Sequence, residues 1–121
     1  MVSEDATLRK LRKICLQLPA ATEGLSFGHP TFRVEKKMFA VLEEYKGELG
    51  IYLNVGKLLQ GVFLNDQRFF RTPYIGKHGW VTLRAYAAPL NWNEIRELVK
   101  GSYDLVAPAK SRPRTKKKRQ G

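Results

Sequence analysis

Cysteine is almost absent from this chain, and so are long apolar runs. Cys15 is the one cysteine in 121 residues, so no disulfide can form within the chain and a cysteine-based zinc cage lacks ligands. No stretch reaches the ~18 to 20 apolar residues that a membrane span requires. Residues 1–12 alternate charged and apolar side chains and so lack the apolar core of a signal peptide. We expect a soluble, cytoplasmic protein with no membrane partner.

The side chains that usually carry catalysis are also scarce or poorly placed. His29 and His78 are the only histidines, and neither has a carboxylate at metal-ligand spacing. We expect His29 to have a structural role, bonding to the backbone in a tight turn stiffened by Pro30, rather than to transfer protons. Cys15 lies on the apolar side of a predicted helix, which favours a buried thiol over a nucleophile. Because nucleophile-elbow and phosphate-loop motifs are missing as well, we predict no enzyme, no metal and no cofactor.

Acidic residues are outnumbered two to one, by 22 Lys and Arg to 11 Asp and Glu, which gives a net charge of +11. Residues 108–121 contain no acid, whereas residues 1–107 contain 15 cations and all 11 acids. The tail cations are Lys110, Arg112, Arg114, Lys116, Lys117, Lys118 and Arg119. Like charges without apolar residues do not fold, so we expect a folded domain over 1–107 and a basic disordered tail over 108–121.

The hydrophobic pattern predicts an α+β domain. Apolar residues recur every three or four positions after Ser3 and again after Asn91, whose spacing to Glu94 fits a capping box, so helices should begin there. Pro19 and Pro108 should end them. Between them we expect strands at 31–35, 38–43, 49–54 and 80–86, tight turns at 35–37 and 45–47, and a helix from Asn54 to about 63 with Leu58, Leu59, Val62 and Phe63 on its apolar side. The strands should form an antiparallel sheet on which both terminal helices pack.

Several short phrases of the sequence carry a family resemblance. They are Leu18-Pro19, Glu23-Gly24, Phe27-Gly28-His29-Pro30 with Phe32-Arg33-Val34, Pro73-Tyr74-Ile75-Gly76-Lys77-His78-Gly79-Trp80-Val81, Trp92, Ser102-Tyr103 and Ala107-Pro108. Together they resemble the MmcQ/YjbR family over about Leu8 to Pro108. The resemblance implies a CyaY-like (frataxin-like) fold and a DNA-binding protein, and it brings no catalytic residues.

Cations alternate with aromatic residues between positions 68 and 84. Such a surface can contact phosphates while its rings stack on bases. The same pattern also fits a glycine-shaped turn with solvated cations, and the cations of residues 9–13 can likewise be a second basic strip or a solvated helix face. The predicted nucleic-acid contacts are Arg33, Arg71, Tyr74, Lys77, His78 and Arg84, together with the seven tail cations.

The leading hypothesis is a monomeric, non-enzymatic protein that binds nucleic acid largely without sequence preference. The family resemblance alone favours DNA over RNA. A second hypothesis is a small-ligand or protein-interaction module whose pocket lies between the sheet and residues 63–79, with the tail as a non-specific tether. A third is an enzyme that acts on a phosphorylated substrate through Arg71, Lys77 and His78. Deletion of residues 110–121 would separate the first hypothesis from the second.

Overall fold

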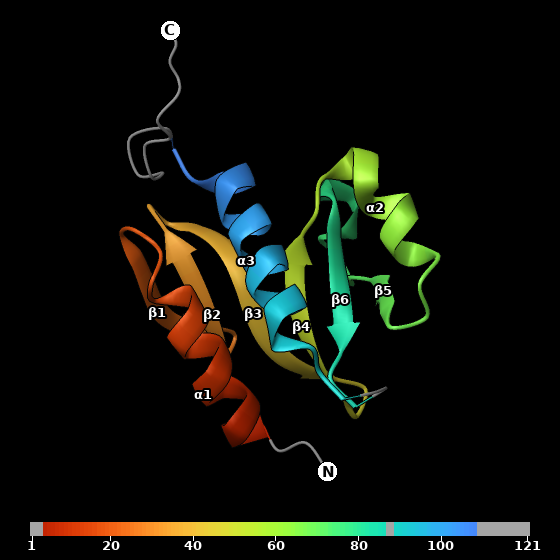
Figure 1. Ribbon diagram of the computed structural model, residues 1–121, viewed down its shortest axis with the longest axis horizontal. Helices are drawn as coiled ribbons and strands as arrows, with labels where there is room; N and C mark the ends of the chain where they lie inside the picture. Colours follow the sequence, from red (N-terminus) through yellow and green to blue (C-terminus); the bar gives the residue numbers. More distant parts are fainter. Residues whose placement is uncertain (1–3, 87–88, 109–121) are drawn as a thin grey trace, which may run out of the picture.

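The computed structural model describes residues 4–86 and 89–108 of the chain. Six strands form one antiparallel sheet in the order β1-β2-β3-β4-β6-β5, and α1 and α3 cover one of its faces (Figure 1). The elements are α1 (Glu4–Cys15), β1 (Ala21–Ser26), β2 (His29–Val34), β3 (Lys37–Tyr45), β4 (Glu48–Asn54), α2 (Lys57–Leu64), β5 (Phe69–Arg71), the 3-10 helix η1 (Gly76–His78), β6 (Trp80–Arg84) and α3 (Trp92–Val106). This is the α+β fold that the sequence predicts. No helix in the described part of the chain is both long and apolar enough to span a bilayer.

Two-residue turns connect the first four strands. The turns are Phe27-Gly28, Glu35-Lys36 and Lys46-Gly47, and all six residues have positive φ. Two-residue turns with positive φ match the right-handed twist of the strands that they join. The structure therefore confirms the two tight turns predicted from the sequence. It adds a third, which is formed by Phe27 and Gly28.

The sheet has a strand at each edge that the sequence pattern does not reveal. β1 is exposed along its middle and pairs with β2 from Ala21 opposite Val34 to Ser26 opposite His29. β5 has only three residues. Alternating hydrophobicity arises when one side of a strand is buried and the other is not, so a mostly exposed strand and a very short one do not produce it.

The core lies between the sheet and the two long helices. Tyr103 of α3 is fully buried there, with its ring edge-to-face against Phe39 at 5.3 Å and its hydroxyl donating to the Pro19 carbonyl at 2.6 Å. Cys15 is fully buried in the same core, and burial raises the pKa of its thiol. The predicted buried thiol is thus confirmed.

The short helix α2 differs from its prediction in both its start and its buried side. It begins at Lys57, because the Asn54 side chain accepts a hydrogen bond from the Gly56 amide instead of capping the helix. Leu58 and Val62 are 96% and 66% exposed, whereas Gln60 is buried. The prediction of an apolar side formed by Leu58, Leu59, Val62 and Phe63 was wrong for the first three, which are exposed, and right for Phe63, which packs against the core. The helix turns Gln60 inward instead, and its amide donates to two carbonyls of the loop beneath it.

The last helix follows its sequence signals closely. The Asn91 side chain accepts a hydrogen bond from the Glu94 amide at 3.1 Å, which confirms the predicted cap. The Glu94 carboxylate does not complete a capping box, because it binds the guanidinium of Arg68 at 2.6 Å. Helix α3 ends at Val106, just before Pro108.

Candidate functional site

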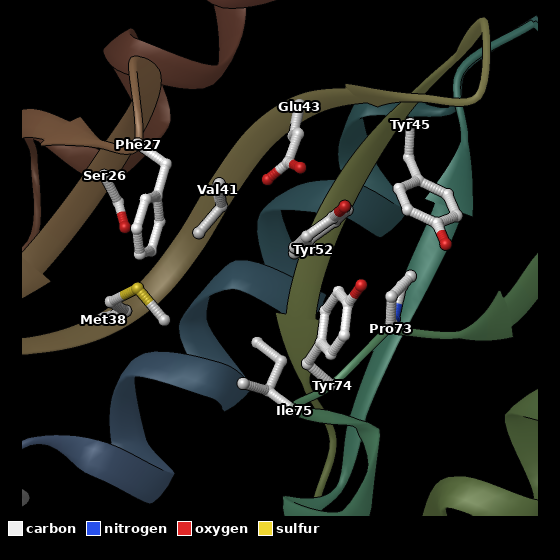
Figure 2. Close-up of a pocket in the computed structure, with 10 residues that line it drawn as sticks. All are labelled: Ser26, Phe27, Met38, Val41, Glu43, Tyr45, Tyr52, Pro73, Tyr74 and Ile75. Atoms are coloured by element: carbon white, nitrogen blue, oxygen red, sulfur yellow. The ribbon is translucent and has the colours of Figure 1, made fainter.

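The face of the sheet that the long helices leave uncovered carries a cavity of about 490 Å³. Figure 2 views this face, with α3 behind the sheet. The cavity lies between the sheet and residues 73–75, within the region where the second hypothesis placed a pocket. Its lining residues are Ser26, Phe27, Met38, Val41, Glu43, Tyr45, Tyr52, Pro73, Tyr74 and Ile75.

Strand alternation builds the floor of the cavity. Val41, Glu43 and Tyr45 occupy every second position of β3 and so share a face, and Tyr52 of β4 pairs directly with Val41. Val41 and Tyr52 form a small cluster of buried side chains with Trp80 of β6. The intervening residues of the same strands, such as Leu42, point into the main core.

Hydrogen bonds hold one wall of the cavity, the loop of residues 72–79, against the sheet. The Thr72 and Thr82 hydroxyls lie 2.9 Å apart, and the buried Gln60 amide donates to the carbonyls of Gly76 and Trp80 at 2.6 and 3.0 Å. Gly79 has φ of 95°, and a Cβ atom there would lie 2.7 Å from the Gly56 backbone. Only glycine fits this close approach, so the position of the wall depends on it.

Two exposed aromatic residues stand on opposite sides of the cavity. Phe27 is 99% exposed and Tyr74 is 89% exposed. Figure 2 shows Phe27 on one side with Ser26 and Met38, and Tyr74 on the other side with Pro73 and Ile75. Phe27 and Tyr74 have φ of 51° and 67°, a left-handed conformation that is uncommon for bulky side chains. The fold therefore exposes two aromatic rings to water, Phe27 from the turn between β1 and β2 and Tyr74 from the cavity wall.

Glu43 is the one charged residue that lines the cavity. Its carboxylate meets the Nε2 atom of His29 at 3.7 Å and forms a hydrogen bond with the Tyr52 hydroxyl. Burial raises the pKa of Tyr52, and the charge of Glu43 is the second cause of the increase. The Tyr52 hydroxyl therefore keeps its proton and can donate it in a hydrogen bond to the carboxylate. The cavity is thus apolar and aromatic with one anionic group. The described residues contain no cluster of three side chains that could hold a metal ion.

A second hollow, of about 200 Å³, lies between the two long helices and has the opposite charge. We call it the helix groove, and its lining residues are Lys10, Lys13, Ile14, Gln17, Trp92 and Arg96. The ammonium of Lys10 lies 5.7 Å from the centre of the Trp92 ring, within the range of a cation–π contact. Sequence reasoning placed Lys10 and Lys13 on a basic helix face, but only the packing of α1 against α3 joins them to Trp92 and Arg96.

The structure keeps four of the predicted nucleic-acid contacts together on one segment. Arg71, Tyr74, Lys77 and His78 are all exposed on residues 71–78. In the described part of the chain, Arg71 and Lys77 make no ion pair. The side chain of Arg71 lies over Gly76, since a Cβ atom on that glycine would be 2.5 Å from the Arg71 Cγ.

Two other predicted contacts lie apart from this segment. Arg84 forms two bonds to the Glu48 carboxylate, at 2.9 and 3.0 Å, and its guanidinium stacks 4.8 Å from the Phe70 ring centre. Its charge is therefore already compensated. Arg33 is on β2, and β3 and β4 separate it from β6. The seven tail cations lie outside the described residues.

The comparisons with known proteins concern the fold and the family. A family model described as YjbR matches residues 16–105. The crystal structure of the Deinococcus radiodurans protein DR2400, with the family-model domain DUF419, matches with a TM-score of 0.71. The match covers 90% of this chain and 82% of that chain at 24% identity, and it supports the fold. A search of curated proteins found no match.

Proposed function

This chain belongs to the YjbR family, and we propose that it is a nucleic-acid-binding protein that uses the helix groove and the basic tail. The observation that carries the proposal is the convergence of three cations from two helices around Trp92, without an acid in the lining. We assign no catalytic step to the chain, and we propose that it acts as a monomer in the cytoplasm.

The helix groove combines the two kinds of group that nucleic acid recognises without sequence preference. Lys10 and Lys13 are exposed on successive turns of α1, and Arg96 is exposed on α3. Their charges can neutralise phosphates, which releases counterions and supplies most of non-specific affinity. The partly exposed Trp92 offers a ring on which a base or sugar can pack.

The segment of residues 71–78 is a weaker candidate for the main contact. It carries Arg71 and Lys77, but its residues 73–75 line the cavity on the face of the sheet that has α3 behind it (Figure 2). A single stretch of duplex that lies in the helix groove would not reach across the sheet to this segment. We therefore place the principal contact on the helices and leave out Arg84, whose charge Glu48 already balances.

The tail adds electrostatic affinity to the groove. Residues 110–119 contain seven cations and no acid. Such a run binds any polyanion, so it should increase affinity for DNA and RNA alike. Our preference for DNA rests on the resemblance of the sequence to a family described as DNA-binding.

The test compares the intact chain with a chain that ends at Ala109, using labelled duplex DNA, single-stranded DNA and RNA at two salt concentrations. If four to six phosphates are neutralised by the intact chain, the logarithm of its affinity should fall against the logarithm of salt concentration with a slope of about −4 to −5. The shorter chain should bind more weakly but still measurably, through the groove. Failure of the shorter chain to bind any nucleic acid would remove the groove from the proposal, and salt-independent binding by the intact chain would contradict it altogether.

A further inference from the structure

We propose that the cavity on the open sheet face binds an organic cation, a small ammonium compound with an apolar body. This inference goes beyond nucleic-acid binding, because the charge of this cavity is opposite to that of the helix groove. In the cavity, a phosphate would be repelled by the carboxylate of Glu43. In the helix groove, it would be attracted by the cations of Lys10, Lys13 and Arg96. The two hollows therefore favour different ligands.

The charge of the cavity comes from one carboxylate that has no strong cationic partner. In the described residues, the ion pair of Glu43 is with His29, at a long 3.7 Å, and neither lysine nor arginine pairs with it. The Tyr52 hydroxyl occupies part of its acceptor capacity. A carboxylate has about four lone-pair positions, so acceptor capacity remains for a donor in the cavity. The buried Val41 and Tyr52 beside Glu43 reduce the screening of its charge by water, so its carboxylate attracts a cation in the cavity more strongly than an exposed carboxylate would.

Aromatic side chains complete the recognition of a cation. Phe27, Tyr45 and Tyr74 line the cavity on two sides, as Figure 2 shows. The faces of aromatic rings are electron-rich, and a set of rings around a hollow is the usual means of binding methylated or alkylated ammonium groups. An alkyl body on the ligand would meet Met38, Val41 and Ile75.

The exposure of the two rings also suggests that a ligand fills the space between them. Phe27 and Tyr74 both have positive φ, and both rings are almost completely exposed. The positive φ of Phe27 belongs to the two-residue turn between β1 and β2. Tyr74 has no such turn to explain its left-handed conformation, and such conformations concentrate at ligand-binding positions. A ligand between the rings would bury their apolar surface, which the fold by itself leaves in water.

The size of the cavity favours a small organic molecule over a metal ion. Its volume of about 490 Å³ is within the range of roughly 300 to 1,000 Å³ that is typical of small-molecule sites. A metal ion needs several ligating side chains close together, and residues 4–86 and 89–108 offer no such group of three.

The experiment is a titration of the full ¹⁵N-labelled chain, followed by two-dimensional NMR, with choline and with its uncharged isostere 3,3-dimethylbutan-1-ol. Benzyltrimethylammonium serves as a third probe with a larger apolar body. We expect choline to bind about tenfold more tightly than the isostere, and benzyltrimethylammonium more tightly still. The shifted amides should be those of β3, β4 and residues 73–75. Equal affinity for choline and its isostere, no saturable shift with either cation, or shifts confined to the helix groove would each overturn the proposal.

Matched variants assign the effect to the cavity. Glu43→Gln keeps the size of the side chain and removes its charge, so it should reduce the affinity for choline about tenfold. Glu44→Gln is the control, because it removes one negative charge from the adjacent exposed residue of the same strand, outside the cavity lining. An equal loss in both variants would show a general charge effect and refute a specific site.

A ring variant keeps the proposal testable if Glu43→Gln does not fold. Tyr74→Asn removes an almost fully exposed ring, and asparagine tolerates the positive φ of this position. We expect a loss of affinity of about three- to tenfold with an unchanged melting temperature. Tyr86→Asn, at an exposed tyrosine outside the cavity lining, should leave the affinity unchanged. Wild-type affinity in Tyr74→Asn would refute the aromatic wall.

Discussion

Removal of the three cations of the helix groove should change both the affinity for DNA and its dependence on salt. The variant Lys10→Gln/Lys13→Gln/Arg96→Gln keeps long polar side chains at three exposed positions, so its stability should stay close to that of the wild type. Each phosphate contact on duplex DNA contributes about 0.9 to the slope of log affinity against log salt concentration. Three lost contacts reduce the magnitude of that slope by about 2.7, from about −4 or −5 to about −1 or −2. At 0.1 M salt the same term corresponds to a loss of roughly 500-fold in affinity.

The assay is fluorescence anisotropy with labelled duplex DNA at four or more salt concentrations, and it needs a control of equal net charge. The variant Lys36→Asn/Lys37→Gln/Lys57→Gln also removes three exposed cations, but none of them lines the groove. The asparagine suits the positive φ of Lys36. If both variants lose affinity and slope equally, the protein responds only to its overall charge. That result would refute a localised contact at the helix groove.

Three further predictions concern the cavity wall and its tyrosine. Gly79→Ala should lower the free energy of unfolding by about 2 to 4 kcal/mol in a denaturant titration, because the new methyl group meets the backbone of Gly56 at a positive φ. The control Gly61→Ala, with nothing within 4 Å of its Cβ position, should gain about 0.5 to 1 kcal/mol of stability from helix propensity. Equal changes in the two variants would contradict the close approach at Gly79. Gln60→Leu should cost about 1 to 3 kcal/mol, since the carbonyls of Gly76 and Trp80 lose the hydrogen bonds from its buried amide and keep only their backbone donors. An equally or more stable variant would show that these two bonds do not hold the wall in place. The pKa of Tyr52 is raised in the folded state, so the tyrosine ionises in the unfolded chain at a lower pH than in the folded protein. The contribution of Tyr52 to stability is therefore fully present below the ordinary tyrosine pKa of about 10, and it is lost as the pH rises above that value. Tyr52→Phe should therefore lose less stability than the wild type above about pH 10. If the stability of both proteins falls identically with pH, the ionisation of Tyr52 does not cause the fall.

Local patterns in the sequence were sufficient for the elements that have one buried side. The cap at Asn91 and the apolar stripe that follows it located α3, because a cap and a helical period depend only on neighbouring residues. The thiol of Cys15 was placed in the core by the same period. The edge strands β1 and β5 escaped detection because their pairing partners, and not their own side chains, define them.

Helix α2 shows how tertiary contacts override a local pattern. Leu58, Leu59 and Val62 suggested an inward apolar face, but the buried side chain of Gln60 faces inward and donates to the carbonyls of Gly76 and Trp80. The two hydrogen bonds of Gln60 tie this helix to the loop and to β6, and they fix which side of the helix faces inward. The sequence of residues 57–64 alone does not predict where those carbonyls lie.

The sequence by itself determined the charge of this protein through its composition, and its fold class and the buried state of its cysteine through short-range periodicity. Its family resemblance rests on short phrases such as Phe27-Gly28-His29-Pro30. Only the tertiary structure decided where ligands can bind. The sheet brings Phe27 and Tyr74 to the two sides of one cavity around Glu43, and the packing of α1 on α3 brings Lys10 to Arg96. Residues that lie far apart in the chain form both hollows, and their proximity follows from strand register and helix packing, which no local segment specifies.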